Sequence, residues 1–309
     1  MTPPKERIKY SAIIDRPKIA LPNGARLIVW TVINLEVWDI SRPMPRQVLP
    51  TPGGNTLLPD VPNWTWHEYG MRVGFWRLYG LYKRLGIRPT VSLNAKVCLD
   101  YPRIAHACKD AGWEFMAHGF EQLPMHHIAD QQDTIRRSLE TIKEFTGKCP
   151  IGWLGPGLTQ TYETPDYLSK AGVKYIADWV HDEEPTKIET ANGPLISLPF
   201  AVECNDITMM VVQHHEAEYW TKKCVDTFDQ LYEESAQRPK FMTIVVHPFI
   251  TGQPSRIKHH ESIYNHIGKH PGVAHWTGEE LMNWYVDATA DQEIIKGTTV
   301  VVPQGARSR

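Results

Sequence analysis

The sequence lacks long apolar runs and a strong charge of one sign. None of its apolar stretches reaches the roughly 18–20 residues that a membrane-spanning helix needs. The first eight residues contain prolines and lysine and lack the apolar core of a signal peptide. The formal net charge of −2 gives no electrostatic reason to expect a nucleic acid or an anionic membrane as a partner. We therefore expect neither membrane insertion nor nucleic-acid binding.

Cysteine is also scarce. The five cysteines are an odd number, are widely spaced and form no CxxC pair, so they do not provide a disulfide framework. They are Cys98, Cys108, Cys149, Cys204 and Cys224. We expect reduced, mostly buried thiols and a cytoplasmic protein.

Nucleotide-binding motifs, internal repeats and low-complexity tracts are absent as well. Neither a GxGxxG motif nor a P-loop follows any expected strand, which removes the usual reason to expect a nucleotide fold. What remains is an ordinary globular composition with 42% hydrophobic and 22% charged residues. A chain of 309 residues is long for one domain, but α/β barrels of this size commonly form a single unit.

Apolar, β-branched runs alternate with segments of helical spacing along most of the chain. Strands are expected over residues 27–33, 90–93, 113–117, 173–177, 207–213 and 241–246, with a hairpin turn at Asn192-Gly193 between residues near 188 and 195–198. Helices are expected over residues 69–85, 101–111, 130–145, 164–170, 216–235, 256–267 and 278–286. This alternation implies parallel strands with right-handed crossovers, and about seven such units favour a barrel over an open sheet.

The expected organisation is one α/β domain with an arm and a tail. Residues 1–26 are polar and proline-rich and form the N-terminal arm, residues 27–290 form the barrel, and residues 291–309 form a C-terminal tail. Within the barrel, residues 41–66 contain six prolines and Gly53-Gly54, so they should be loop. A loop of this length often covers a binding site.

Five polar clusters each follow an apolar, strand-like run. They are Asn34-Leu35-Glu36, His118-Gly119, Gly152–Gly157, Asp178-Trp179 and His247-Pro248. Because the C-terminal ends of parallel strands in such barrels share one face, where these folds carry their chemistry, we expect the five clusters to form a single site.

The charged members of these clusters are candidate catalytic residues. An unpaired Glu36 carboxylate beside an apolar strand is costly unless it is hydrogen-bonded, ion-paired or metal-bound, although it could also simply emerge into the loop. His247 could transfer a proton near neutral pH. His118 on its own would be interpreted as a packed or solvated ring. Its candidacy as a catalytic residue is strengthened because Glu36 and His247 occupy equivalent positions at other strand ends. Asp178 either orients a histidine or caps the next segment.

Aromatic residues and a further histidine extend the candidate site. Trp153 and Trp179, with Trp64 and Trp66, could form an aromatic pocket or could fill gaps in the core of a large barrel. His214 follows an expected strand and begins a helix, so it is either a wall of the site or part of an ordinary strand-to-helix junction.

The motifs resemble those of the polysaccharide deacetylase (NodB-homology) superfamily, and more closely its allantoinase-like and cyclic-imidase-like branch. The most specific piece is the segment Glu68–Leu78, EYGMRVGFWRL, which is similar to a glycine-containing helix start in the allantoinase-like enzymes. Gly152-Trp153 with Gly155, and His247-Pro248 with Gly252 and Arg256, resemble two further motifs of that branch. The resemblance implies a distorted (β/α)₇ barrel, hydrolysis of an amide-type C–N bond, and a homodimer or homotetramer.

The chain departs from the superfamily at the positions that hold a metal. Metal-dependent members have an aspartate pair in the first motif and two histidines at i and i+4 in the second. Here Asn34 stands at the position of the family's aspartate base, and Gln122 stands at the position of the second histidine. The allantoinase-like branch includes members that work without metal. Two alternatives follow: no metal, or a divalent cation such as Zn²⁺ held by Glu36 and His118, with His126 or His127 as a substitute ligand.

The leading hypothesis is a hydrolase of a small cyclic amide, ureide or imide. Glu36 or His247 would be the base, and His118 would position the substrate or stabilise the oxyanion. Asn34, Arg72 and Gln122 are candidates for substrate binding, because their amide and guanidinium groups can form hydrogen bonds with a planar ureide or imide. The alternatives are a metal-dependent deacetylase of N-acetylated sugars and a barrel that binds a ligand without catalysis.

Overall fold

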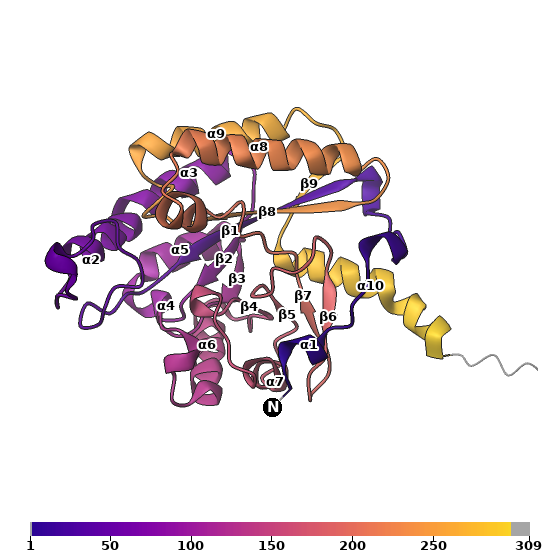
Figure 1. The fold of residues 1–309 in the computed structure, drawn as a ribbon, viewed down its shortest axis with the longest axis horizontal. Helices are drawn as coiled ribbons and strands as arrows, with labels where there is room; N and C mark the ends of the chain where they lie inside the picture. Colours follow the sequence, from indigo (N-terminus) through magenta and orange to yellow (C-terminus); the bar gives the residue numbers. More distant parts are fainter. Residues whose placement is uncertain (1, 298–309) are drawn as a thin grey trace, which may run out of the picture.

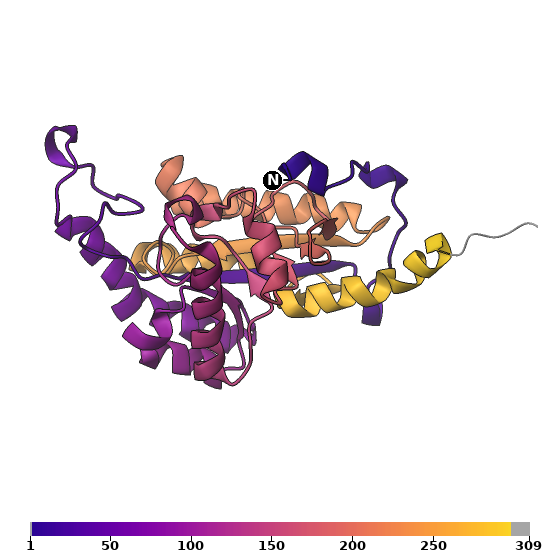
Figure 2. The same cartoon turned by 90° about the horizontal axis from the view of Figure 1, so that it is seen from below.

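The computed structural model of the chain describes residues 2–297, and Figure 1 shows helices surrounding a curved sheet. Within these residues no helix is both long and apolar enough to cross a membrane. The expected tail falls partly outside the described residues. Its first part continues the last helix, α10 (Gly278–Gly297), which extends away from the sheet in Figures 1 and 2.

Parallel strands form most of the sheet. Seven of them are adjacent in the order β7-β5-β4-β3-β2-β1-β8. Their bounds are β1 (Leu27–Leu35), β2 (Thr90–Leu93), β3 (Glu114–Ala117), β4 (Gly152–Trp153), β5 (Tyr175–Ile176), β7 (Leu195–Ser197) and β8 (Lys240–Val246). Two short strands complete the sheet: β9 (Val273–Trp276) is parallel to the start of β1, and β6 (Thr186–Ile188) is antiparallel to β7.

The barrel has a seam between β7 and β8. These two strands are not paired with each other in the described part of the chain, and an isolated bridge between Asn205 and Val245 lies beside β8 instead. The architecture is therefore the expected α/β barrel of the distorted, seven-stranded kind. All nine residues of β1 and all seven of β8 are buried, because helices cover the outer face of the parallel sheet and leave no strand face to water.

The helices of the barrel mostly follow the strands. Their bounds are α2 (Val61–Tyr69), α3 (Phe75–Leu85), α4 (Val97–Asp100), α5 (Pro102–Asp110), α6 (Gln131–Thr146), α7 (Thr164–Lys170), α8 (Ala217–Glu234) and α9 (Pro254–Ile267). Local sequence explains their ends. The Asp130 side chain accepts a hydrogen bond from the Asp133 amide at 2.9 Å at the start of α6, and Gly147 ends the helix with a φ of 85°.

Two expected elements were wrong. The segment expected as a strand over residues 207–213 is the π-helix η7 (Ile207–Val212), because it lies at the seam and its amides bond within the segment, as from Gln213 N to Thr208 O. A β-branched run forms a strand only where a neighbouring strand can pair with it. The loop expected to extend to residue 66 ends earlier, since α2 begins at Val61 with Asp60 as its N-cap and Pro62 in its first turn.

The N-terminal segment packs against the body of its own chain. It contains the short helix α1 (Pro4–Arg7), which lies beside α7 in Figure 1. Arg7 is buried and forms two hydrogen bonds with Asp166 of α7 at 2.9 and 2.6 Å. Arg16 pairs in the same way with Asp182, at 2.8 and 2.6 Å. The proposed boundaries between arm, barrel and tail stay a prediction.

Candidate active site at the strand ends

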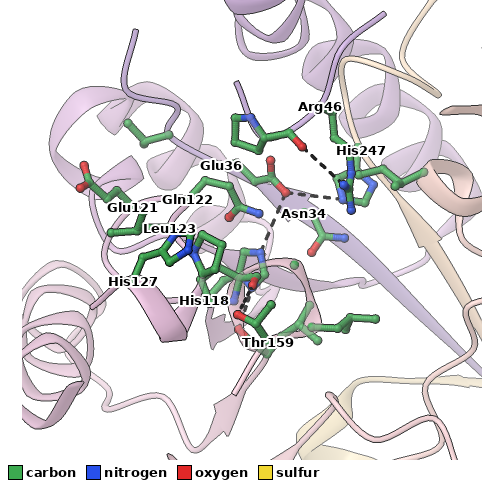
Figure 3. Close-up of a pocket in the computed structure, with 18 of the residues that line it drawn as sticks. Asn34, Glu36, Arg46, His118, Glu121, Gln122, Leu123, His127, Thr159 and His247 are labelled. Carbon is green, nitrogen blue, oxygen red and sulfur yellow. Dashed lines mark hydrogen bonds and ion pairs between the residues drawn. The ribbon is translucent and has the colours of Figure 1, made fainter. Parts of the chain in front are cut away.

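A cavity of about 480 Å³ lies at the C-terminal ends of the central strands. Asn34 and Glu36 enter it from the end of β1, His118 from the end of β3 and His247 from the end of β8. The loop that follows β1 contributes a further wall, which includes Arg46 (Figure 3). The size is within the range of pockets that hold small molecules.

Glu36 lies between the two histidines. Its Oε1 atom is 3.9 Å from Nε2 of His118 and 3.6 Å from Nε2 of His247, as Figure 3 shows. Its other oxygen accepts a hydrogen bond from the indole of Trp38 at 2.5 Å, and its backbone carbonyl accepts one from Nε2 of His67 at 3.0 Å. The carboxylate is only 3% exposed. The Trp38 hydrogen bond offsets part of the cost of burying the carboxylate, and the other carboxylate oxygen faces the cavity.

His118 has a fixed tautomer. Its Nδ1 donates to the Leu154 carbonyl at 2.7 Å, and because a carbonyl oxygen only accepts, the Nδ1 atom carries the hydrogen. Burial lowers the pKa of His118, and the Glu36 carboxylate partly offsets this effect. The neutral ring therefore presents an unprotonated Nε2, a hydrogen-bond acceptor, toward Glu36.

His247 is held by a buried carboxylate, that of Asp206. Its Nδ1 donates to Asp206 Oδ1 at 2.7 Å, and its backbone amide donates to Oδ2 at 2.8 Å. The hydroxyl of Thr251 also donates to Oδ2, at 2.6 Å. Asp206 is fully buried, so it can both orient the imidazole and stabilise its protonated form.

Close backbone packing fixes the segment after β8. A Cβ atom on Gly70 would overlap the backbone of Phe249, and one on Gly74 would overlap the carbonyl of Pro248. These two glycines bound the π-helical turn η4 (Gly70–Gly74), which joins α2 to α3. Their missing side chains let the helix lie directly against the residues that follow His247. The glycine-containing segment singled out in the sequence therefore supports the site without lining it.

The structure brings together five of the ten candidate site residues expected from the sequence. The residues that line the cavity are Asn34, Glu36, His118, Gln122 and His247. Gln122 is held by its neighbours: its backbone N–H donates to the Val37 carbonyl at 3.0 Å, and its side-chain Oε1 accepts from Asn94 Nδ2 at 3.3 Å.

The other five candidates do not line the cavity. Arg72 is exposed on the outer side of η4, and His214 is exposed after η7. Trp153 is fully buried in the core, and Trp179 packs at the edge of the core. Asp178 is buried and accepts a hydrogen bond from the Gly155 amide at 2.5 Å, so it supports a loop and does not contact His247. Burial raises its pKa to about 7, an effect that the Gly155 amide opposes.

Three contributors to the site were missed. Asp206 precedes an apolar run that was read as a strand, which placed it at a strand start, away from the catalytic face. Trp38 and Arg46 lie in the irregular segment after β1, where periodicity gives no direction for a side chain. The one usable signal was the polar pair Asn205-Asp206, but it precedes an apolar run, whereas the recognised clusters follow one.

The side chains present do not fit a resident catalytic zinc ion. Such an ion takes three protein ligands and a water. Glu36 and His118 supply two, and the third family position is Gln122, whose Oε1 atom already bonds with Asn94. Although His127 and His247 also line the cavity, no third His, Cys, Asp or Glu ligand atom among the described residues completes a group with Glu36 and His118 in which all atoms lie within 4.8 Å of one another. Across residues 2–290, three such side chains have ligand atoms within 4.8 Å of one another at a different place, outside the cavity. They are Asp229 of α8, His266 of α9 and His270 just after α9.

Comparisons with known proteins agree with the fold. Residues 65–176 match the family described as polysaccharide deacetylase. A peptidoglycan deacetylase of Helicobacter pylori is 26% identical over 247 residues, which is 68% of this chain and 82% of that protein.

Two solved structures share the fold. A probable polysaccharide deacetylase of Pseudomonas aeruginosa has a TM-score of 0.80 with 24% identity over 88% of this chain and 95% of its own. The allantoinase PuuE has a TM-score of 0.79 with 21% identity over 91% of this chain and 98% of its own. The comparisons confirm the expected enzyme class, a hydrolase of carbon–nitrogen bonds other than peptide bonds. The family match over residues 65–176 and the shared distorted (β/α) barrel confirm the resemblance to the polysaccharide deacetylase (NodB-homology) superfamily that the sequence motifs indicate.

Proposed function

We propose that this protein hydrolyses a C–N bond in a small amide, ureide or cyclic imide, with Glu36 as general base and His247 as general acid. The observation that carries the proposal is the position of Glu36 Oε1, which faces Nε2 of both His118 and His247 at 3.9 and 3.6 Å inside the cavity. A general base must lie within reach of the proton that it removes, directly or through one water.

The first step is attack of water on the substrate carbonyl carbon. A water placed between Glu36 Oε1 and His118 Nε2 would donate one hydrogen to each, because both atoms are acceptors. Glu36 takes the proton as the oxygen bonds to carbon, and the carbonyl oxygen becomes an oxyanion. The side-chain amide of Asn34 faces the cavity with no partner in the described part of the chain, so its N–H groups can donate to that oxyanion.

The second step breaks the C–N bond. Protonated His247, held by Asp206, gives a proton to the leaving nitrogen, and Glu36 then returns its proton to His247 across the 3.6 Å contact. One water is consumed and both groups recover their starting protonation. His118 positions the water or a substrate N–H; its lowered pKa and acceptor Nε2 favour this role over oxyanion stabilisation.

A small substrate is supported by the shape of the site. The cavity of about 480 Å³ is walled by the loop after β1, including Arg42, Pro43 and Arg46. These lining residues support the expectation that the loop covers the site. A polymer would need a groove open at both ends, whereas a ring of a few atoms with several carbonyl and N–H groups suits the polar side chains present.

A second candidate is a metal-dependent deacetylase of N-acetylated sugars, which the name of the Helicobacter pylori relative favours. This reaction requires a divalent cation, and the cavity offers only two strong ligands at the superfamily's metal positions, Glu36 and His118, which argues against it. We favour the metal-free reaction.

The two candidates differ in metal requirement and substrate. Purified protein would be screened against amides, ureides, cyclic imides and N-acetylated sugars, as isolated, after chelator treatment and after adding Zn²⁺. Turnover of a small cyclic or ureide substrate that survives chelation supports the proposal. Turnover that appears only with Zn²⁺ and an N-acetylated sugar rejects it in favour of the second candidate.

Location and assembly stay predictions. The cytoplasmic location expected from the cysteines is supported by five free thiols, of which all but Cys149 are buried. The expected partners are a small-molecule substrate and further copies of the chain in a dimer or tetramer.

A further inference from the structure

Arg46 is a cation of the cavity wall that has no acidic partner among the residues that the structure describes. It lines the same cavity as Glu36 and His247 (Figure 3) and is half-buried. Its one hydrogen bond among the described residues is a long one, 3.4 Å, to the carbonyl of the preceding Pro45. A guanidinium has five N–H donors, so most of the hydrogen-bonding capacity of Arg46 is available to a ligand.

The acidic side chains at the cavity mouth are already matched by other cations. Arg42 pairs with Asp39 at 3.2 Å and with Glu121 at 2.8 Å. Lys96 lies 3.9 Å from Glu121 on the other side. Lys96 also lies 3.8 Å from Asp100. Among the described residues no carboxylate, including that of Glu36 in the same cavity, forms an ion pair with Arg46, so the charge of Arg46 has no paired anion.

The backbone on both sides of Arg46 is anchored. Met44, two residues earlier, is buried in the core. On the other side, the buried Asn63 side chain accepts from the amides of Val48 and Leu49 at 2.7 and 3.1 Å and donates to Leu49 O at 2.9 Å. The guanidinium is therefore presented to the cavity from a fixed base, as a preorganised binding group requires.

We infer that Arg46 binds a carboxylate on the substrate, so that the substrate is a small amide, ureide or cyclic imide that carries a carboxylate beside the scissile C–N bond. The planar fork of a guanidinium matches the two oxygens of a carboxylate. A single uncompensated cation suits a monoanion better than a phosphate dianion. The inference rests on the proposed function, which it narrows to acidic substrates.

Matched substrate pairs test the inference. Each pair is an amide, ureide or cyclic imide with either a carboxylate or a carboxamide at the same position, for example hydantoin-5-acetate and hydantoin-5-acetamide. Wild-type protein should prefer the carboxylate member. In Arg46→Gln we expect the KM for that member to rise roughly 10- to 100-fold, with kcat changed far less and the carboxamide member unaffected. Arg46→Lys should recover part of the preference, since it keeps the charge without the fork.

Two controls separate this inference from the proposed function. Arg84→Gln removes the same charge from a surface pair with Glu261 and should leave the preference intact. The second control measures binding without turnover. The thermal shift that the carboxylate members cause is measured in the Glu36→Gln protein and in the Glu36→Gln, Arg46→Gln double variant.

Each outcome decides one of the two proposals. Hydrolysis with no carboxylate preference, or with a preference that survives Arg46→Gln, overturns the inference and leaves the function. Carboxylate stabilisation that needs Arg46, with no member of the panel hydrolysed, upholds the anion site and overturns the proposed reaction. No stabilisation and no hydrolysis reject both.

Discussion

The imidazole of His247 lies between two carboxylates, with Nδ1 2.7 Å from Asp206 and Nε2 3.6 Å from Glu36. The two carboxylates are in different settings. Asp206 accepts three hydrogen bonds, from His247 Nδ1, the His247 amide and Thr251, whereas Glu36 keeps one oxygen facing the cavity. Asp206 is thus committed to holding the ring, and Glu36 is free to exchange a proton with water.

Asp206→Asn should reduce kcat by about 100- to 10,000-fold while leaving the fold intact, because an amide can keep part of the hydrogen bonding but cannot stabilise a protonated ring. The measurement is steady-state kinetics on any substrate found in the screen, with circular dichroism for the fold. Asp229→Asn is the matched control, since Asp229 forms an exposed pair with His266 at 2.6 Å. A loss of similar size in both variants would contradict the role given to Asp206.

Glu36→Gln and His247→Ala, made one at a time, should each abolish measurable turnover, because general acid–base steps contribute about 100- to 10,000-fold each. Glutamine keeps the shape of the side chain and its bond with Trp38 but is no base. Ligand binding by the Glu36→Gln protein should persist, which thermal shifts would detect. A rate near that of the wild type in either variant removes that residue from the mechanism.

Chelator treatment followed by dialysis should leave turnover of a small substrate unchanged, because two strong ligands are too few for a resident zinc ion of the catalytic type. Elemental analysis should find no zinc that tracks with activity. Gln122→His restores three potential ligands and should raise zinc affinity, measured by titration calorimetry against the wild type. Zinc at one equivalent in the active wild-type protein would overturn the metal-free mechanism.

Gly74→Ala should destabilise the protein by about 1–3 kcal/mol, because the added methyl group overlaps the carbonyl of Pro248. Activity should fall as well, since the displaced backbone follows His247 directly. Gly80→Ala in the same helical stretch is the control: Gly80 is exposed with no atom within 4 Å of an added Cβ, and alanine should stabilise by about 0.5–1 kcal/mol. Urea unfolding of both variants gives the comparison.

Asp178→Asn should change how stability depends on pH. The pKa of Asp178 is raised to about 7 by burial, so the folded state binds a proton that the unfolded state has already released between about pH 4 and pH 7. The folded protein therefore loses stability as pH rises through this window, by up to about 4 kcal/mol. Asparagine cannot ionise, so the urea midpoint of the variant should fall less between pH 5 and pH 8. Parallel curves for the two proteins would refute the raised pKa.

Much of the architecture follows from local patterns in the sequence. Apolar runs such as residues 27–33 and 241–246 specify buried strands. The helices expected between consecutive strands imply that these strands pair in parallel. The polar residues that follow two of these runs, Glu36 and His247, therefore had to meet on one face of the barrel. The glycine-containing segment before α3 was also recognisable, although its contact with Pro248 was not.

Only the tertiary structure decided which polar groups pair. Asp178 ends a strand as expected, yet it contacts the Gly155 loop, and Asp206 from the seam is the partner of His247. Arg46 enters the cavity because the buried Met44 and Asn63 hold the proline-rich loop on either side of it. Local periodicity fixes which face a strand residue occupies, but it carries no information about the curvature of a sheet, the position of its seam or the path of an irregular loop. Those depend on contacts between residues far apart in the chain, and they determine the chemistry of this site.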